Sequence, residues 1–348
     1  MKSFFHGKKI LVTGHTGFVG SWLTKILVGW GADVVGVSLA PHAEPNLFDV
    51  LKLKDLVTHY EVDITNQNEL NKIFKETRPE IVFHLAAQAL VRTSYDLPEL
   101  TYLTNVIGTT NVLGAIRQTP SVRSGLIVTT DKVYRNNESG NPFKETDSLG
   151  GHDPYSASKA AADLITSSYI DSFFQKENSP FFAIVRSGNV FGGGDWAKDR
   201  LIPDIVRAVY QTNTPTIIRN PKSVRPWQHV IEPVAGYLLL VKKLFEGNKS
   251  CVGAWNFGPN DSLSCTVEEM TRRAVTLLGR GTFKVIPEVQ KPEAGLLRLD
   301  CTKAKKQLGW EQKLDLETSL RWTFEWYREF YEHGNSLLMT EQQIEKYF

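Results

Sequence analysis

The sequence has few cysteines, no long hydrophobic run and almost no net charge. Its three cysteines, Cys251, Cys265 and Cys301, are too few and too irregularly spaced for a disulfide scaffold or a zinc site, and they suit a reducing compartment. Forty basic and 38 acidic side chains leave a formal charge of +2. Nucleic-acid-binding proteins carry a concentrated basic surface, so this balance argues against a nucleic-acid partner.

Hydrophobic runs are short throughout the chain. None approaches the ~18 consecutive apolar residues that a membrane-spanning helix needs. The longest candidate, residues 237–241, ends at Lys242 and Lys243. Residues 1–9 carry neither the apolar run nor the small-residue cleavage site of a signal peptide. We therefore expect a cytoplasmic protein with no membrane partner.

What the sequence does contain is the composition of a globular protein. It has 348 residues, of which 41% are hydrophobic and 22% charged. At ~150 residues per domain, this length predicts about two domains. Short apolar runs alternate with helical periodicity, at residues 10–13, 33–38, 81–86, 126–130 and 182–185. Strands that are apolar on both faces and separated by helices predict a doubly wound α/β fold around a parallel sheet.

The composition changes after about Asn189, where glycine and proline become frequent. We expect residues 1–190, together with about 226–251, to form a Rossmann domain that binds a dinucleotide. Residues 191–225 and 252–348 are expected to form a smaller C-terminal domain that binds the substrate.

A glycine-rich turn follows the first expected strand and opens the first helix. It consists of Gly14, His15, Thr16, Gly17, Phe18, Val19 and Gly20. Glycines at these places allow a tight turn, let the backbone approach a pyrophosphate and bring the helix onto the sheet. The alternative is an ordinary strand-to-helix turn. The position of the pattern within a strand–helix–strand unit favours dinucleotide binding.

The glycine spacing, together with Tyr155 and Lys159 in a Tyr-x-x-x-Lys pattern, resembles the extended short-chain dehydrogenase/reductase family. Matching segments run from residue 10 to about residue 310. The resemblance implies that NAD is the cofactor. Besides the glycine turn, it places these residues at the cofactor: Asp63, Ile64, Leu85, Ala86, Ala87, Gln88, Asn105, Tyr155 and Lys159.

One position departs from the family pattern. The second strand usually ends in an acidic residue that hydrogen-bonds the adenosine ribose, but Ser38 to Ala40 include no carboxylate. No lysine or arginine lies between Ser38 and Val50 to receive a 2′-phosphate. We therefore expect NAD rather than NADP, bound weakly. The alternative is that a later residue, such as Glu44, takes the place of the missing carboxylate.

Tyr155 and Lys159 lie one helical turn apart, so both side chains leave the same face of a helix. A phenol with a pKa of ~10 is a poor base at neutral pH. We expect the Lys159 ammonium and the charged nicotinamide to lower the pKa of Tyr155, and Lys159 to hold the nicotinamide ribose. The alternative is a pair without function on the surface of an amphipathic helix.

Thr130, Asp131 and Lys132 end the strand that begins near Leu126, at the edge where ligands bind in doubly wound sheets. The alternative is a solvated turn with a local ion pair. By resemblance, an epimerase has small hydroxyl residues here, whereas a dehydratase has an acid and a base to remove water. The dTDP-glucose dehydratases have Asp-Glu at this place. The Asp-Lys pair therefore resembles the CDP-glucose 4,6-dehydratases.

The segment 192–203 is the most specific further match to that branch. The segment between Tyr134 and Glu145 departs from it, because it lacks an expected tryptophan, and Val133 stands where the branch has cysteine. The identity of the hexose therefore stays open. The resemblance implies that the sugar nucleotide is bound by Asn189, Arg200, Leu201, Arg219, Arg225 and His229.

The resemblance implies an NAD-dependent hydro-lyase that converts CDP-glucose to its 4-keto-6-deoxy product. The alternatives are a dehydratase acting on a UDP-N-acetylhexosamine, GDP-sugar or dTDP-sugar, a sugar-nucleotide 4-epimerase, and a regulator that binds NAD without catalysis. We expect no metal, because His84 and His229 lack close ligand partners in the sequence. We expect a homodimer or a dimer of dimers, built on the helices that carry Asn105 and Tyr155.

Overall fold

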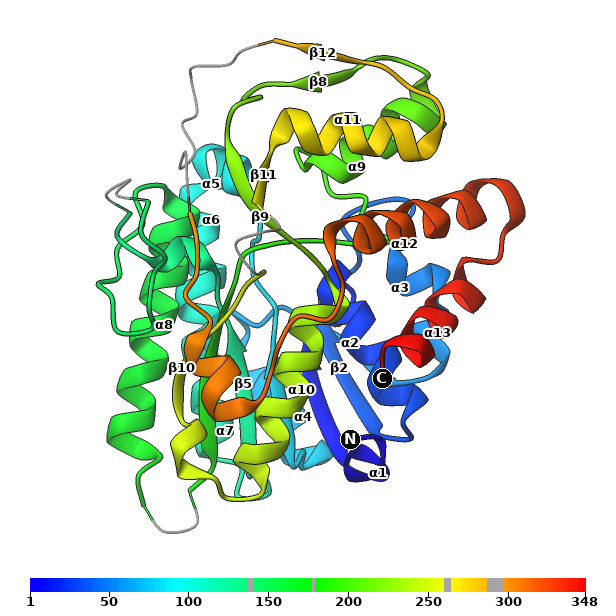
Figure 1. Ribbon diagram of the computed structural model, residues 1–348. Helices are drawn as coiled ribbons and strands as arrows, with labels where there is room; N and C mark the ends of the chain where they lie inside the picture. The colour runs from blue at the N-terminus through cyan, green and yellow to red at the C-terminus, as the bar shows by residue number, and fades with distance from the viewer. Residues whose placement is uncertain (137–139, 177–178, 260–263, 287–296) are drawn as a thin grey trace.

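The computed structural model describes residues 1–136, 140–176, 179–259, 264–286 and 297–348 (Figure 1). Residues 137–139, in the segment that departs from the CDP-glucose branch, lie outside the described residues. No helix in the described ranges has both the length and the apolar character needed to cross a membrane.

A seven-stranded sheet forms the centre of the molecule, in the order β10-β6-β5-β4-β1-β2-β3, and every neighbouring pair is parallel. The strands are β1 (Lys9–Thr13), β2 (Asp33–Ser38), β3 (Thr58–Glu61), β4 (Ile81–His84), β5 (Ser124–Val128), β6 (Phe181–Ser187) and β10 (Gly253–Phe257). The strand order reverses between β1 and β4, which is where ligands bind in such sheets. The predicted doubly wound α/β fold is confirmed.

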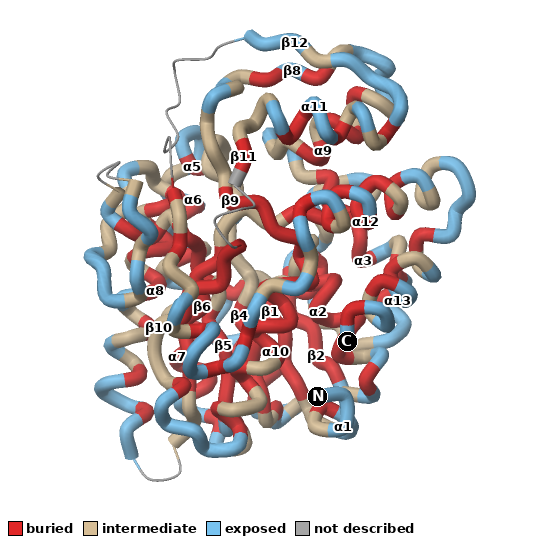
Figure 2. Tube along the Cα trace, viewed as in Figure 1, coloured by how far each residue is buried: buried red, intermediate tan, exposed pale blue. Residues whose placement is uncertain are grey.

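Helices cover both faces of this sheet (Figures 1 and 2). One face carries α2 (Phe18–Gly29) and α10 (Ile231–Phe245), and the other carries α4 (Gln67–Thr77), α7 (Thr109–Arg117) and α8 (Pro154–Phe173). Within β1, Ile10 and Val12 pack in the first core, and Leu11 packs in the second. Because successive side chains of a strand point to opposite faces, burial on both sides requires the unbroken apolar runs seen in the sequence.

The second region packs over the carboxyl ends of the strands (Figure 1). It contains a three-stranded sheet of β11 (Ser264–Thr266), β9 (Val224–His229) and β7 (Asn189–Phe191), and a parallel pair of β8 (Thr216–Ile218) and β12 (Phe283–Val285). Its helices are α9 (Leu201–Val206), α11 (Val267–Leu278), α12 (Leu316–Arg328) and α13 (Ser336–Tyr347). The two-domain division stays a prediction. The expected boundary at 252 assigned β10 to the second domain, whereas this strand pairs with β6 in the large sheet.

Shorter elements connect these parts. The α-helices are α1 (Lys2–Phe5), α3 (Leu47–Val50), α5 (Val91–Asp96) and α6 (Pro98–Tyr102). The 3-10 and π-helical segments are η1 (Leu53–Asp55), η2 (Leu103–Gly108), η3 (Asp131–Val133), η4 (Arg207–Thr212), η5 (Lys249–Cys251), η7 (Ala304–Leu308) and η8 (Glu329–His333). Of these, α5, η2 and η3 lead into or support the site described next.

Candidate active site

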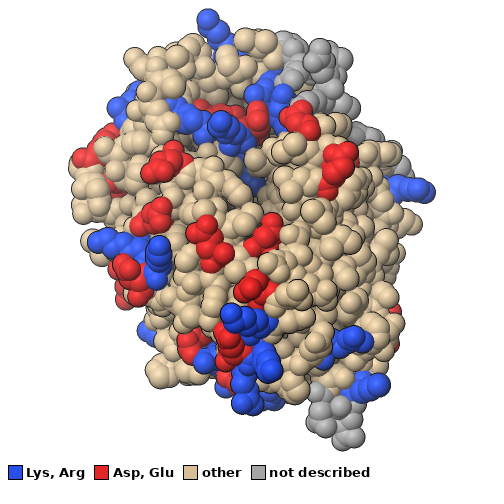
Figure 3. All heavy atoms as spheres, turned by 180° about the vertical axis from the view of Figure 1, so that it is seen from behind, with Lys and Arg blue, Asp and Glu red and all other residues tan. Residues whose placement is uncertain are grey.

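A cavity of about 380 Å³ lies between the carboxyl edge of the large sheet and the second region. Three of the residues that line it are aspartates, and seven are basic: Arg92, Lys132, Lys159, Lys198, Arg200, Arg219 and Arg225. Seen from behind, lysine and arginine side chains gather at a hollow in the upper part of the molecule, with acidic side chains beside them (Figure 3). The excess of positive charge suits an anionic ligand.

The glycine turn has the geometry of a phosphate-binding loop. Gly14 has φ +74°, and a Cβ there would lie 2.6 Å from the backbone nitrogen of Ala86. A Cβ on Gly20 would lie 2.1 Å from the carbonyl oxygen of Gly14. Helix α2 begins after Gly17, and no side chain caps its N-terminus. Its first backbone N–H groups are therefore available to an anion, and Val19 of the same turn lines the cavity.

The side chain of His15 points beneath this turn rather than toward a ligand. It is fully buried, and its Nε2 lies 2.8 Å from Nδ1 of His59. Burial and the neighbouring His59 lower the pKa of His15 to about 3. A Cβ on Gly36 would lie 2.4 Å from the His15 ring, so only glycine fits at that point of β2. Gly36 and His59 were not singled out from the sequence, because their role depends on pairing between strands.

Thr16 ties the turn to the end of β2. Its Oγ1 lies 2.7 Å from Oγ of Ser38 and donates to the carbonyl oxygen of Leu39 at 2.9 Å. The glycine turn is thus held to the end of β2, where Ser38 also pairs with Glu61 of β3 in the sheet register. That no carboxylate serves the ribose here stays a prediction.

Asn105 links the loop after β4 to helix α8. Its Oδ1 accepts from the backbone of Gln88 at 2.8 Å, and its Nδ2 donates to Oγ of Ser158 at 2.8 Å. Asn105 lies in the π-helical segment η2, a conformation that is frequent at functional sites. Leu85 and Ala87 from the same loop line the cavity. Asn105 thus holds the loop in position and does not itself line the cavity.

The other expected cofactor residues lie in neighbouring loops. Asp63 follows β3, and its Oδ1 accepts from the backbone of Thr65 at 2.8 Å. Ile64 is buried against Gly108, where a Cβ would lie 2.5 Å from its Cδ1. Ala86 lies against the glycine turn at Gly14.

Tyr155 and Lys159 both line the cavity from the first turns of α8. Asp153 caps this helix, since its Oδ1 accepts from the backbone of Ser156 at 2.9 Å. The Nζ of Lys159 donates to the carbonyl oxygen of Val128 at 2.7 Å. Burial lowers the pKa of Lys159 to about 8, and Asp163 acts in the opposite direction. The lysine is thus held between α8 and the end of β5.

The expected lowering of the Tyr155 pKa is not found among the chain's own groups. Burial raises the pKa of this phenol above its ordinary value, and Asp131 adds to the rise. Lys132 acts most strongly in the opposite direction, followed by the hydrogen bond with Thr130 and by Arg200. Desolvation therefore outweighs the neighbouring cations, which sequence spacing alone does not reveal.

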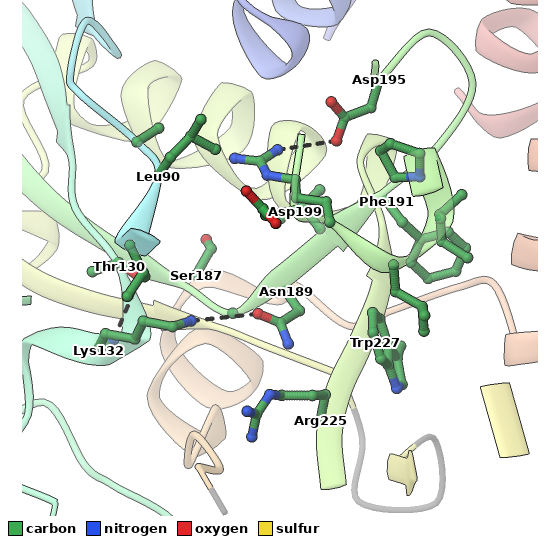
Figure 4. A pocket seen from close by; sticks show the side chains of 18 of the residues that line it. Leu90, Thr130, Lys132, Ser187, Asn189, Phe191, Asp195, Asp199, Arg225 and Trp227 are labelled. Carbon is green, nitrogen blue, oxygen red and sulfur yellow. Dashed lines mark hydrogen bonds and ion pairs between the residues drawn. The ribbon is translucent and has the colours of Figure 1, made fainter. Parts of the chain in front are cut away.

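Thr130 and Lys132 are brought together with Asn189 at the cavity (Figure 4). The Oγ1 of Thr130 donates to Oδ1 of Asp131 at 3.0 Å. The Nζ of Lys132 lies 3.4 Å from the same oxygen and 3.4 Å from Oδ1 of Asn189. Thr130 and Lys132 line the cavity, whereas Asp131 is buried directly behind them. The cluster places a carboxylate and an amine close to the Tyr155 hydroxyl.

Further basic side chains come from the segment before α9 and from the second region. Nη1 of Arg200 lies 3.0 Å from Oδ2 of Asp195. Asp199 is shared between Arg219, at 2.8 Å, and Arg92, at 3.5 Å. Arg225 on β9 and Leu201 at the start of α9 also line the cavity. Arg92 was not singled out from the sequence, because nothing local to α5 shows that it faces the second region.

His229 lies away from the cavity, contrary to expectation. It is fully buried, with its ring 5.7 Å from that of Trp22, 6.2 Å from that of Phe191 and 5.9 Å from that of Trp322. Burial lowers its pKa to about 3. The side chain packs in an aromatic core, so we leave it out of the site. Within the described ranges, no three or more His, Cys, Asp or Glu side chains are grouped so that they could hold a metal ion.

Related proteins match the sequence over nearly its whole length. The sequence model of the GDP-mannose 4,6 dehydratase family matches residues 11–323. CDP-glucose 4,6-dehydratase of Salmonella typhimurium is 43% identical to the chain, over 99% of this chain and 98% of the relative.

Solved structures match the fold over nearly the whole chain. UDP-glucose 4-epimerase of Thermotoga maritima, solved with UDP-glucose, aligns with a TM-score of 0.80 at 26% identity, over 93% of this chain and 100% of that one. dTDP-glucose 4,6-dehydratase of Bacillus anthracis, solved with NAD, aligns with a TM-score of 0.78 at 25% identity, over 95% of this chain and 100% of that one. The sequence match and the shared fold together show that this chain belongs to the GDP-mannose 4,6 dehydratase family.

Proposed function

We propose that this protein is a CDP-glucose 4,6-dehydratase that uses NAD and forms a 4-keto-6-deoxy sugar nucleotide. The observation that carries the proposal is Lys132, which lines the cavity together with Tyr155 and whose Nζ lies 3.4 Å from the buried carboxylate of Asp131. The similarity to the Salmonella typhimurium enzyme over the full chain supports this choice of substrate. A 4-epimerase has no use for an added acid and base, and a regulator would not need the Tyr155–Lys159 pair.

The residues present fit NAD. The close approach at Gly14 and the uncapped N-terminus of α2 suit a pyrophosphate, and Lys159 is placed to hold the nicotinamide ribose. NAD held there would supply the acceptor for the hydride from C4 of the sugar and the donor that returns it to C6. Asp63, Ile64 and the loop 85–88 flank the same edge of the sheet.

In the proposed reaction, Tyr155 takes the proton of the sugar 4-hydroxyl, and Thr130 hydrogen-bonds the same oxygen. The resulting 4-ketone acidifies the proton on C5, which is why oxidation precedes elimination. Lys132 then removes the C5 proton, and Asp131 protonates the departing 6-hydroxyl, which leaves as water. The proton held by Lys132 returns to C5 when the hydride is returned to C6. Lys132 lines the cavity, and its Nζ lies 3.4 Å from Oδ1 of Asp131, which is buried behind it.

The sugar-nucleotide diphosphate is assigned to the basic end of the cavity. Arg225 is placed to clamp paired phosphate oxygens, and Asn189 lies between it and Lys132 (Figure 4). Arg200, Leu201 and Arg219 also line the cavity and complete the proposed substrate contacts.

One assay tests the proposal. The purified protein with added NAD is incubated with CDP-, UDP-, GDP- and dTDP-glucose and with a UDP-N-acetylhexosamine, and loss of one water is followed by mass spectrometry. Loss of water from CDP-glucose above all others is expected. Preference for another sugar nucleotide would show that CDP-glucose is not the substrate. A change of stereochemistry without loss of water would identify an epimerase.

We expect added NAD to be required for activity, because no carboxylate follows β2. Ala40→Asp should strengthen NAD binding by about 1–3 kcal/mol, the contribution of a hydrogen bond to a charged group. Calorimetric titration with NAD measures this, with Ala40→Asn as the uncharged control. Wild-type protein that keeps stoichiometric NAD through extensive dialysis would contradict the expectation. A loss of affinity in Glu44→Gln would show that Glu44 serves instead.

We further propose a homodimer built on α6, η2 and α8. Large apolar side chains are exposed on these adjoining elements, including Leu100 (46%), Leu103 (46%), Ile107 (47%) and Leu164 (59%). Exposed apolar side chains on adjoining elements support this choice of interface. Leu100→Glu with Leu164→Glu should give a monomer in sedimentation velocity. Leu338→Glu, at an equally exposed leucine on α13, is the control that should stay dimeric.

A further inference from the structure

Two hydroxyl groups meet at the base of the cavity and have no part in the mechanism above. Ser187 ends β6, and Tyr237 lies in the middle of α10, on the face of the sheet that α2 also covers. The Ser187 Oγ and the Tyr237 hydroxyl oxygen lie 2.6 Å apart. Both side chains are nearly fully buried, and both line the cavity.

The sheet register places this pair beside the reacting groups. Val128 of β5 pairs with Val185 of β6, and Thr130 and Ser187 each follow two residues later. Their side chains therefore reach the cavity at the same level (Figure 4). Tyr155 also contributes to the raised pKa of Tyr237, whose main cause is burial.

The pair has one hydroxyl hydrogen more than it uses. Two hydroxyls carry two hydrogens, and a single hydrogen bond between them consumes one. Among the described residues, neither side chain makes another hydrogen bond. The rest of the buried face of α10 is apolar except for Glu232, whose carboxylate accepts from Leu314 and Tyr347. A buried donor without an acceptor is costly, so the remaining hydrogen requires a partner in the cavity.

We propose that this remaining hydrogen is donated to the carboxamide oxygen of the nicotinamide ring, an inference that rests on the proposed use of NAD. The ring has to lie beside Tyr155 and Lys159, which is where the pair opens into the cavity. A neutral hydroxyl suits a neutral amide, whereas the diphosphate faces the basic residues of the second region. The hydrogen bond fixes the rotation of the ring and thus the face that it presents to C4 of the sugar.

Binding measurements on the double variant Ser187→Ala/Tyr237→Phe test the proposal. Replacing both hydroxyls leaves no unpaired partner, so the fold should be kept, with an unchanged thermal midpoint as the check. ADP-ribose contains every part of NAD except the nicotinamide ring. By calorimetry, the variant should bind NAD roughly 2- to 10-fold more weakly, the range for one hydrogen bond, and bind ADP-ribose like the wild type.

Tyr169→Phe, which removes a hydroxyl from the outer part of α8, is the matched control and should leave both affinities unchanged. Equal weakening of NAD and ADP-ribose would overturn the proposal and assign the pair a structural role. Unchanged NAD binding with a raised KM for the sugar nucleotide would overturn it in favour of a contact to the sugar. Failure of the wild type to bind NAD at all would refute the proposed function itself.

Discussion

Tyr155→Phe is expected to lower turnover by about 10²–10⁴-fold, the usual contribution of a positioned acid–base group, while sugar-nucleotide binding stays nearly unchanged. The change removes only the hydroxyl oxygen. The backbone N–H of Tyr155 still donates to Oγ of Ser94 at 3.1 Å, and the ring keeps its buried position. Loss of water is measured by mass spectrometry, and binding of CDP by calorimetry.

The matched control is again Tyr169→Phe, since Tyr169 lies on the same helix but away from the cavity. A variant that retains wild-type turnover would remove Tyr155 from the proposed mechanism. A variant that loses CDP affinity as strongly as turnover would instead assign the hydroxyl to substrate binding.

Lys132→Met should stop elimination after oxidation has taken place. Lys132 is the proposed base for the C5 proton, so exchange of that proton with deuterated water should slow by about 10²–10⁴-fold. Methionine keeps much of the length of the side chain but removes the amine that contacts Asp131 and Asn189. Deuterium incorporated at C5 is measured by mass spectrometry on recovered sugar nucleotide.

Lys249→Met, at an exposed lysine after α10, makes the same chemical change elsewhere and should leave exchange unaffected. The two cavity variants also differ from each other. Tyr155→Phe should block oxidation and with it all later exchange, whereas Lys132→Met should block only proton removal. Unchanged C5 exchange in Lys132→Met would place the base on another residue.

Local sequence patterns were sufficient to predict the fold, and they singled out the residues at the centre of the candidate site. Strands buried on both faces need unbroken apolar runs, so apolar runs such as that of β1 were enough to predict the parallel sheet. The glycine turn and the spacing of Tyr155 and Lys159 depend on backbone geometry over a few residues. Thr130, Asp131 and Lys132 are consecutive, so the strand that precedes them was enough to predict that all three lie at the same edge of the sheet.

Only the tertiary structure decided which distant residues meet and how deeply each is buried. It brought Ser187 to Tyr237, and Arg92 to Asp199, across separations that no local pattern encodes. It also placed His229 in an aromatic core and buried Tyr155 so deeply that the chain's own groups leave the pKa of this phenol raised. The physical reason is the same in each case. Desolvation and contact depend on what the whole chain packs around a side chain, and this is set by non-local packing rather than by the neighbours in sequence.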